Sequence, residues 1–260
     1  MGQNCPKPPP ISRCQGKMTR EAMVRLQNIH VLSEPKEGAV APYKILLIVH
    51  IIAGFIALTT AAVATMTKTL DVAHRWHVSS GTVFFWGMVV IFLTAIPLAL
   101  IRPNTFLFLI AILSFYFALA GWRYATHRRG SPRPLDWVSA SVMALAAGIM
   151  IIFGVFLLSR RNTNGITMMI LGGIGAALSL SDIRTLHHGG AKGPQRIAQH
   201  LTMMLAGTIA TITAFVVTNF TVQPAFIVWL APTVVITPII IVWNRKIRAG
   251  KRPRGMPELS

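Results

Sequence analysis

Seven long apolar runs follow one another along this chain of 260 residues. Each run is close to the roughly 20 residues that a helix needs to cross a lipid bilayer. The apolar residues are continuous and do not alternate with polar ones, which favours helices over membrane β-strands. The sequence therefore predicts an all-α fold, a polytopic integral membrane helical bundle with about seven transmembrane helices. We place them near 43–67, 78–101, 104–126, 136–158, 165–186, 196–219 and 225–244.

The charged residues agree with a membrane protein. They make up only 12% of the chain, against roughly 25% in soluble globular proteins. The formal net charge of +18 could suggest a nucleic-acid-binding protein. The basic residues, however, lie between the apolar runs, as loop charges of membrane proteins do. We therefore expect the lipid bilayer, and not nucleic acid, as the partner; further membrane-protein partners or a homo-oligomer remain open.

The two ends of the chain differ from its middle. Residues 1–42 are rich in proline and charge, so we interpret them as a polar, disordered N-terminal tail. This tail contains Cys5 and Cys14, whose spacing matches no metal-binding motif. Residues 43–246 form the predicted transmembrane domain, and residues 247–260 form a basic C-terminal tail.

The loop charges predict an orientation in the membrane. Fifteen of the 25 Lys and Arg residues lie in the loops after the first, third and fifth helices or at the C-terminus. Most of the others lie in or next to the N-terminal tail, and only charges close to a helix end weigh heavily. The side with fifteen charges is therefore predicted to be cytoplasmic, and the C-terminus with it.

Most polar side chains that could form a site fall near the predicted cytoplasmic ends of the helices. They are His74, His77, Arg123, Asp136, Asp182, Arg184 and His200. His50 lies toward the outer end. A rise of 1.5 Å per residue places His50 about 10 Å below the outer surface and His200 about 7 Å above the inner one. These two histidines are therefore predicted to lie too far apart to share one haem iron.

Several of these residues also have a simple structural interpretation. Asp136 can cap the start of the fourth helix, where a negative charge interacts favourably with the helix dipole. Asp182 can form a local ion pair with Arg184, because acids inside membranes normally find a partner. His187 and His188 precede a glycine-rich loop and are expected to be solvated.

Two further features concern the arrangement of the helices. Lys68, Asp71, His74, Arg75 and His77 are interpreted as a short polar turn between the first two helices. The fifth apolar run is rich in glycine, alanine and serine from residue 172 to residue 181. Small residues let helix backbones approach closely, so we expect this helix to lie at the centre of the bundle.

Several motifs, taken in order, resemble one bacterial family of membrane proteins. They are HIIAGFIAL, HRWHVSSGTVFFWGMVV, LSFYFALAGWR, LDW, SDIR and QHLTMMLAGTIATITAFVVTN. The resemblance, to the family known as domain of unknown function 2306 or a close relative, covers residues 45–245. It implies a polytopic protein of the bacterial inner membrane and no established reaction. Its recurrent polar positions fall here on His50, His74, Asp136, Asp182, Arg184 and His200. An arginine expected soon after the last histidine is replaced by Thr202, Met203 and Met204.

The sequence leaves the function open among four classes. The first is a redox or metal protein that binds haem b or a divalent metal at the cytoplasmic end. Its candidate cofactor-binding residues are His50, His74, His77 and His200. Its candidate metal ligands are His74, Asp182 and His200. The supporting polar residues are Arg123, Asp136 and Arg184. The others are a small-solute or proton transporter, a zinc hydrolase and an accessory subunit without a site. The sequence has no HxxxH or HExxH spacing, which argues against the zinc hydrolase. We predict one site centred on His200, with Asp182 facing it.

Overall fold

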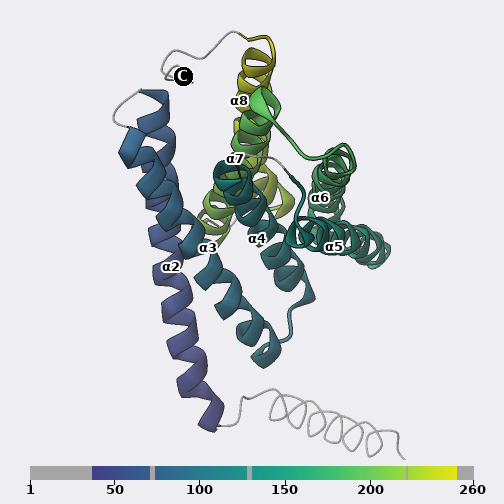
Figure 1. Cartoon of the computed structure of the whole chain (residues 1–260). Helices are drawn as coiled ribbons and strands as arrows, with labels where there is room; N and C mark the ends of the chain where they lie inside the picture. Colours follow the sequence, from purple (N-terminus) through teal and green to yellow (C-terminus); the bar gives the residue numbers. More distant parts are fainter. Residues whose placement is uncertain (1–36, 71–73, 128–130, 221, 251–260) are drawn as a thin grey trace, which may run out of the picture. The chain divides into compact units, whose positions relative to one another are not determined.

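The computed structural model describes residues 37–70, 74–127, 131–220 and 222–250. These residues form seven helices and no strand (Figure 1). The helices are α2 (Glu37–Thr69), α3 (His74–Ile101), α4 (Thr105–Thr126), α5 (Pro134–Ser159), α6 (Asn164–His187), α7 (Gly193–Asn219) and α8 (Phe226–Arg248). All seven contain a segment that is long and apolar enough to cross a membrane. The predicted all-α helical bundle is therefore confirmed, and the chain is a multi-pass membrane protein.

Several helices extend beyond the apolar runs that predicted them. Helix α3 begins at His74, so His74, Arg75 and His77 lie in its first turn. Lys68 belongs to the last turn of α2. The predicted polar turn was therefore wrong for these four residues, and Asp71 lies outside the described residues. The physical reason is that apolar composition marks only the part of a helix inside hydrocarbon, whereas backbone hydrogen bonding continues beyond it.

The first and last helices also extend past the predicted limits of the transmembrane domain. Residues 37–42, assigned to the tail, are helical, and α8 continues two residues past 246. The rest of both predicted tails, residues 1–36 and 251–260, lies outside the described residues. The chain divides into two units, Met1–Ile45 and Leu46–Ser260, and every contact discussed below lies within the second unit.

Local sequence explains where some helices begin. The side chain of Asn104 accepts a hydrogen bond from the backbone N–H of Leu107 at 3.1 Å, which caps the start of α4. At the start of α5, Oδ2 of Asp136 accepts a hydrogen bond from the backbone N–H of Arg133 at 3.0 Å. Pro134 occupies the first turn of the same helix, where its missing N–H has no cost. The capping role predicted for Asp136 is confirmed.

Helices α5 and α6 make the most extensive contact in the second unit and lie next to each other in Figure 1. Glycines of α6 allow this close approach. A Cβ at Gly172 would lie 3.0 Å from the side chain of Met150, and one at Gly175 would lie 2.7 Å from that of Met143. Helix α6 also bonds to α4 through the side chain of Asp182, and its backbone otherwise makes only a small contact with α8. Helix α4, and not α6 as predicted, therefore holds the central place in the second unit. Small residues determine how closely one neighbour approaches and do not determine how many neighbours a helix has.

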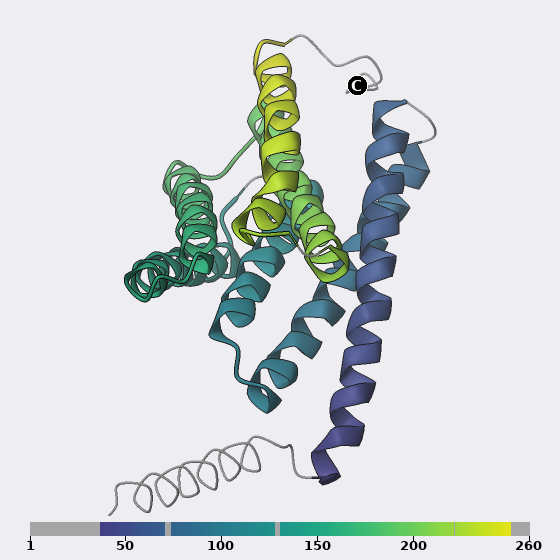
Figure 2. The same cartoon turned by 180° about the vertical axis from the view of Figure 1, so that it is seen from behind.

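Helix α4 joins the α5–α6 pair to the other helices. It packs on α5 and also on α3 and α7, and α7 packs in turn on α8 (Figure 2). A Cβ at Gly121 would lie 2.9 Å from the side chain of Met204, so glycine is needed where α4 meets α7. Trp122 of α4 stacks on Phe85 of α3 with ring centroids 4.6 Å apart. Sequence neighbours pack together as expected for α3–α4, α4–α5, α5–α6 and α7–α8, but α6 and α7 make no extensive contact.

Candidate functional site

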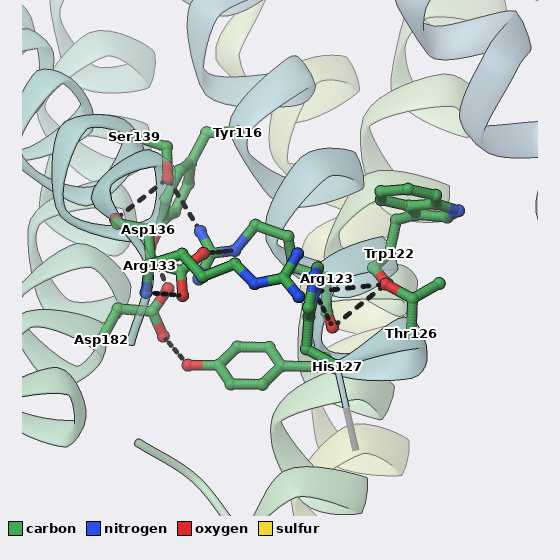
Figure 3. Close-up of polar contacts among 10 residues, drawn as sticks. Tyr116, Trp122, Arg123, Thr126, His127, Arg133, Asp136, Ser139 and Asp182 are labelled. Atoms are coloured by element: carbon green, nitrogen blue, oxygen red, sulfur yellow. Dashed lines mark hydrogen bonds and ion pairs between the residues drawn. The ribbon is translucent and has the colours of Figure 1, made fainter. Parts of the chain in front are cut away.

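One group of polar side chains lies where α4, α5 and α6 meet, and we call it the carboxylate cluster. Its members are Tyr116, Arg123 and Tyr124 of α4, Asp136 and Ser139 of α5, and Asp182 of α6. Residues 116, 123 and 124 fall on one face of α4, because seven and eight residues are close to two helical turns. Three different helices are thus connected through one polar contact region (Figure 3).

Asp182 is fully buried, with 0% of its surface exposed. The hydroxyl of Tyr116 donates a hydrogen bond to Oδ2 at 2.7 Å, and that of Tyr124 donates to Oδ1 at 2.7 Å. Both carboxylate oxygens therefore have a donor, which a buried acid requires. The predicted local ion pair of Asp182 with Arg184 was wrong, because the partners come from α4 and Arg184 is exposed.

Arg123 and Asp136 form the one ion pair found within the described residues. Nε of Arg123 lies 2.5 Å from Oδ1 of Asp136, and an Nη atom of the same guanidinium donates to Oγ of Ser139 at 2.8 Å (Figure 3). Only 4% of Arg123 and 8% of Asp136 are exposed. Taking two charges out of solvent has a large desolvation cost, which this pairing and the hydrogen bonds offset.

The sequence analysis missed Tyr116, Tyr124 and Ser139. A signal for the tyrosines was present, since they share one face of a helix that also carries Arg123. Ser139 gave no signal, because a serine one turn into a helix usually bonds to its own backbone, as this one does to the carbonyl of Asp136 at 3.1 Å.

A second polar group lies between α2, α3, α4 and α7, and we call it the histidine group: His74, His77 and His200. The ring centroids of His77 and His200 lie 6.3 Å apart, with the ring planes at 88°. Those of His74 and His77 lie 6.5 Å apart. His74 is exposed, whereas His77 and His200 are half-buried.

His77 and His200 are held in the same way. Nδ1 of His77 lies 2.9 Å from the carbonyl oxygen of Ala64 on α2, and Nδ1 of His200 lies 2.9 Å from that of Gly121 on α4. A carbonyl oxygen can only accept, so Nδ1 is the protonated nitrogen of each ring. Within the described residues, no hydrogen bond involves Nε2 of either histidine. In the neutral tautomer each Nε2 therefore keeps a lone pair for a ligand.

His50 does not belong to the histidine group, so the predicted set of four cofactor-binding histidines needs a correction. Its Nδ1 lies 2.8 Å from the hydroxyl oxygen of Thr94 on α3. Thr94 follows His77 by 17 positions on the same helix, which corresponds to about 25 Å along the axis. His50 and His200 are thus too far apart for one haem iron, as the sequence predicted.

The predicted single site is not formed, because α4 separates its members. Asp182 and His200 both contact the stretch of α4 between Tyr116 and Tyr124, so they lie at a similar level, as expected. They approach different faces of that helix, and no hydrogen bond or ion pair joins them in the described part of the chain. Across residues 37–70, 74–127, 131–220 and 222–250, no three His, Cys, Asp or Glu side chains could hold a metal ion. The predicted ligand set of His74, Asp182 and His200 is therefore not assembled.

These features define the class of the molecule: a multi-pass membrane protein with two separate polar groups on either side of one helix. Comparisons with family models, curated proteins and solved structures found no match for the chain. The resemblance to domain of unknown function 2306 therefore stays a prediction.

Proposed function

We propose that this multi-pass membrane protein binds one haem b, which His77 and His200 would hold. The observation that carries the proposal is the matched state of these rings: each has Nδ1 on a backbone carbonyl and no hydrogen bond on Nε2 in the described chain. Histidines that bind metals almost always donate their other N–H to a carbonyl, a carboxylate or water, which fixes the tautomer and the ring orientation.

The spacing of the two rings supports a single metal centre. A bond of about 2 Å between a metal and Nε2 puts the ring centroid about 3 Å from the metal. Two imidazoles that would hold one ion through Nε2 can have centroids at most about 6 Å apart, which is close to the 6.3 Å between His77 and His200. Haem needs only two axial ligands from the protein, whereas zinc sites need three or four. The ligand count thus favours haem over a divalent metal.

A glycine close to His77 leaves open space beside the helix. Gly81 lies one turn after His77 on the same face of α3, and a Cβ built at Gly81 would meet no atom within 4 Å. Haem bound there would supply one-electron transfer. The chain's own contribution is to orient the two imidazoles through the carbonyls of Ala64 and Gly121.

An absorption spectrum of the purified full chain, with metal analysis of the same sample, tests this proposal. The wild type should show a Soret band and bound iron, and His77→Ala or His200→Ala should each lose most of both. His187→Ala, which removes an exposed histidine outside the group, serves as the control and should keep them. Bound zinc or copper without a Soret band would contradict haem and show that the site binds a divalent metal. Neither haem nor metal in the wild type would contradict the proposal and favour an accessory subunit.

Proton or small-solute transport is the second candidate, and the burial of Asp182 favours it. Ionisable residues within transmembrane helices often mark a proton or solute path. Both oxygens of Asp182 are occupied by tyrosines, which argues for a structural role and places this candidate second. Flux measured in proteoliposomes with the wild type and Asp182→Asn would test it: a flux that the variant abolishes supports transport.

We also propose that the C-terminus is cytoplasmic and that the host membrane is the bacterial inner membrane. The last turn of α8 carries Arg245, Lys246 and Arg248, and such charges favour the cytoplasmic side. A reporter that is active only in the periplasm should be silent when fused after Ser260. The same reporter inserted after Arg161, between α5 and α6, should be active, because an odd number of spans separates the two positions. The reverse pattern would overturn the orientation.

Membership in domain of unknown function 2306 is a further proposal, which rests on the order of the motifs.

A further inference from the structure

A polar cavity of about 260 Å³ lies at the end of α6 and the start of α7. It belongs to neither the carboxylate cluster nor the histidine group. Its lining residues are Ser181, Arg184, Thr185, His188, Gly190 and Gln195. The cavity therefore combines one guanidinium group with hydroxyl, imidazole and amide groups, and no acid is among its described lining residues.

No acid among the described residues neutralises the positive charge of Arg184. Asp182, two residues earlier, is fully buried, and both of its oxygens accept hydrogen bonds from tyrosines. Asp136, the acid that forms an ion pair within the described chain, is bound to Arg123. Arg184 itself is exposed and forms no ion pair among the described residues.

Some polar groups of the lining are already engaged. The hydroxyl of Thr185 donates to the carbonyl of Ser181 at 2.8 Å, and Nδ1 of His188 lies 2.7 Å from the carbonyl of Arg184. Thr185 and His188 are thereby held by α6 itself. The guanidinium of Arg184 and the amide of Gln195 have no hydrogen bond within the described residues, so they can donate to a ligand in the cavity.

We propose that this cavity binds the phosphate group of an anionic membrane lipid. A guanidinium forms paired, charge-assisted hydrogen bonds with phosphate oxygens. The cavity lies where one membrane-spanning helix ends and the next begins, which is the level of the lipid headgroups. Basic pockets between transmembrane helices are known to bind anionic lipid headgroups. The proposal does not depend on haem binding.

Lipid-dependent thermal stabilisation of the purified full chain in detergent tests the proposal. Titration with a short-chain phosphatidylglycerol should raise the melting temperature, and phosphatidylcholine should have a much smaller effect. Arg184→Gln should weaken the apparent affinity for phosphatidylglycerol roughly tenfold, since it removes a charge-assisted contact. Gln195→Glu should also weaken it, by repulsion, and Gln195→Lys should strengthen it.

Arg245→Gln is the matched control, because it removes an exposed arginine from the last turn of α8, outside the cavity. It should leave the affinity for phosphatidylglycerol unchanged. An equal loss in Arg184→Gln and Arg245→Gln, or no loss in Arg184→Gln, would overturn the proposal. Inorganic phosphate is tested alone at the same concentration. If it raises the melting temperature as much as phosphatidylglycerol does, and Arg184→Gln abolishes this rise, the phosphate group does not come from a lipid.

Discussion

The carboxylate cluster and the histidine group contact the same stretch of α4 but differ in how completely their polar atoms are bonded. In the carboxylate cluster, Asp182 has a donor on each oxygen, and Asp136 binds Arg123 through one oxygen and a backbone N–H through the other. In the histidine group, His77 and His200 each have one ring nitrogen bonded and one without a hydrogen bond in the described chain.

This difference separates a structural polar group from a binding group. A cluster whose carboxylate oxygens are all bonded between packed helices fixes the relative positions of those helices. The carboxylate cluster connects the α5–α6 pair to α4 in this way. An oriented imidazole with a lone pair contributes less to helix packing, but it can bind a metal. We therefore expect changes in the cluster to act mainly on stability and changes in the histidine group to act mainly on ligand binding.

The largest loss of stability is expected from Asp136→Ala. The change leaves the buried guanidinium of Arg123 without its counter-ion and removes the cap of α5. Breaking a buried ion pair from one side costs about 3–5 kcal/mol. Thermal unfolding of the purified protein, followed by circular dichroism, measures the effect. The double variant Arg123→Met with Asp136→Ala should recover part of the loss, because no buried charge remains. A double variant less stable than Asp136→Ala would contradict this explanation.

The next largest effect is expected from Tyr116→Phe and Tyr124→Phe. Each removes one hydrogen bond to the buried carboxylate of Asp182 and keeps the aromatic ring. A hydrogen bond to a charged group contributes about 1.5–3 kcal/mol. Thr59→Val is a matched control, because that hydroxyl is exposed and bonds only to carbonyls of its own helix. If either tyrosine variant melts like the control, the carboxylate cluster does not hold the helices together.

A smaller effect on stability is expected from His200→Ala and His77→Ala in protein freed of any bound cofactor. Each change removes one neutral hydrogen bond, to the carbonyl of Gly121 or Ala64, which contributes about 1 kcal/mol. Melting curves of cofactor-free wild type and variants measure it. A loss as large as that of Asp136→Ala would show that both groups are structural and would remove the distinction between them.

The sequence predicted the helices well because hydrophobic length is a local property. Each spanning segment needs its own apolar run, so composition alone locates it. Helix ends were less accurate, as at His74, because a helix can continue into polar sequence outside the membrane. The capping role of Asp136 was also predictable, since a cap involves residues that are close in sequence.

The partners of the candidate residues could not be predicted, because they depend on which helices pack together. Asp182 lies two residues from Arg184, yet it bonds to tyrosines 66 and 58 positions earlier in the chain. His200 and Asp182 are joined by a short connection, but their helices pack on different neighbours. The sequence predicted that Asp182 and His200 lie at a similar level, and their contacts with α4 agree with this. Only the packing around α4 shows that these two residues belong to two groups.

The smallest effect is expected from His187→Ala. This variant tests whether cofactor binding depends on the position of a histidine or only on the presence of a histidine. His187 is exposed at the end of α6, and its ring touches that of Trp137 at a centroid distance of 4.7 Å. It belongs to neither polar group, and exposed side chains outside special features contribute little to stability. The variant should melt like the wild type and keep the same bound cofactor. A loss of cofactor equal to that of His200→Ala would mean that binding does not depend on the oriented rings of the histidine group. An unchanged His187→Ala beside an impaired His200→Ala would assign binding to that group, because only its rings are fixed by carbonyls of neighbouring helices.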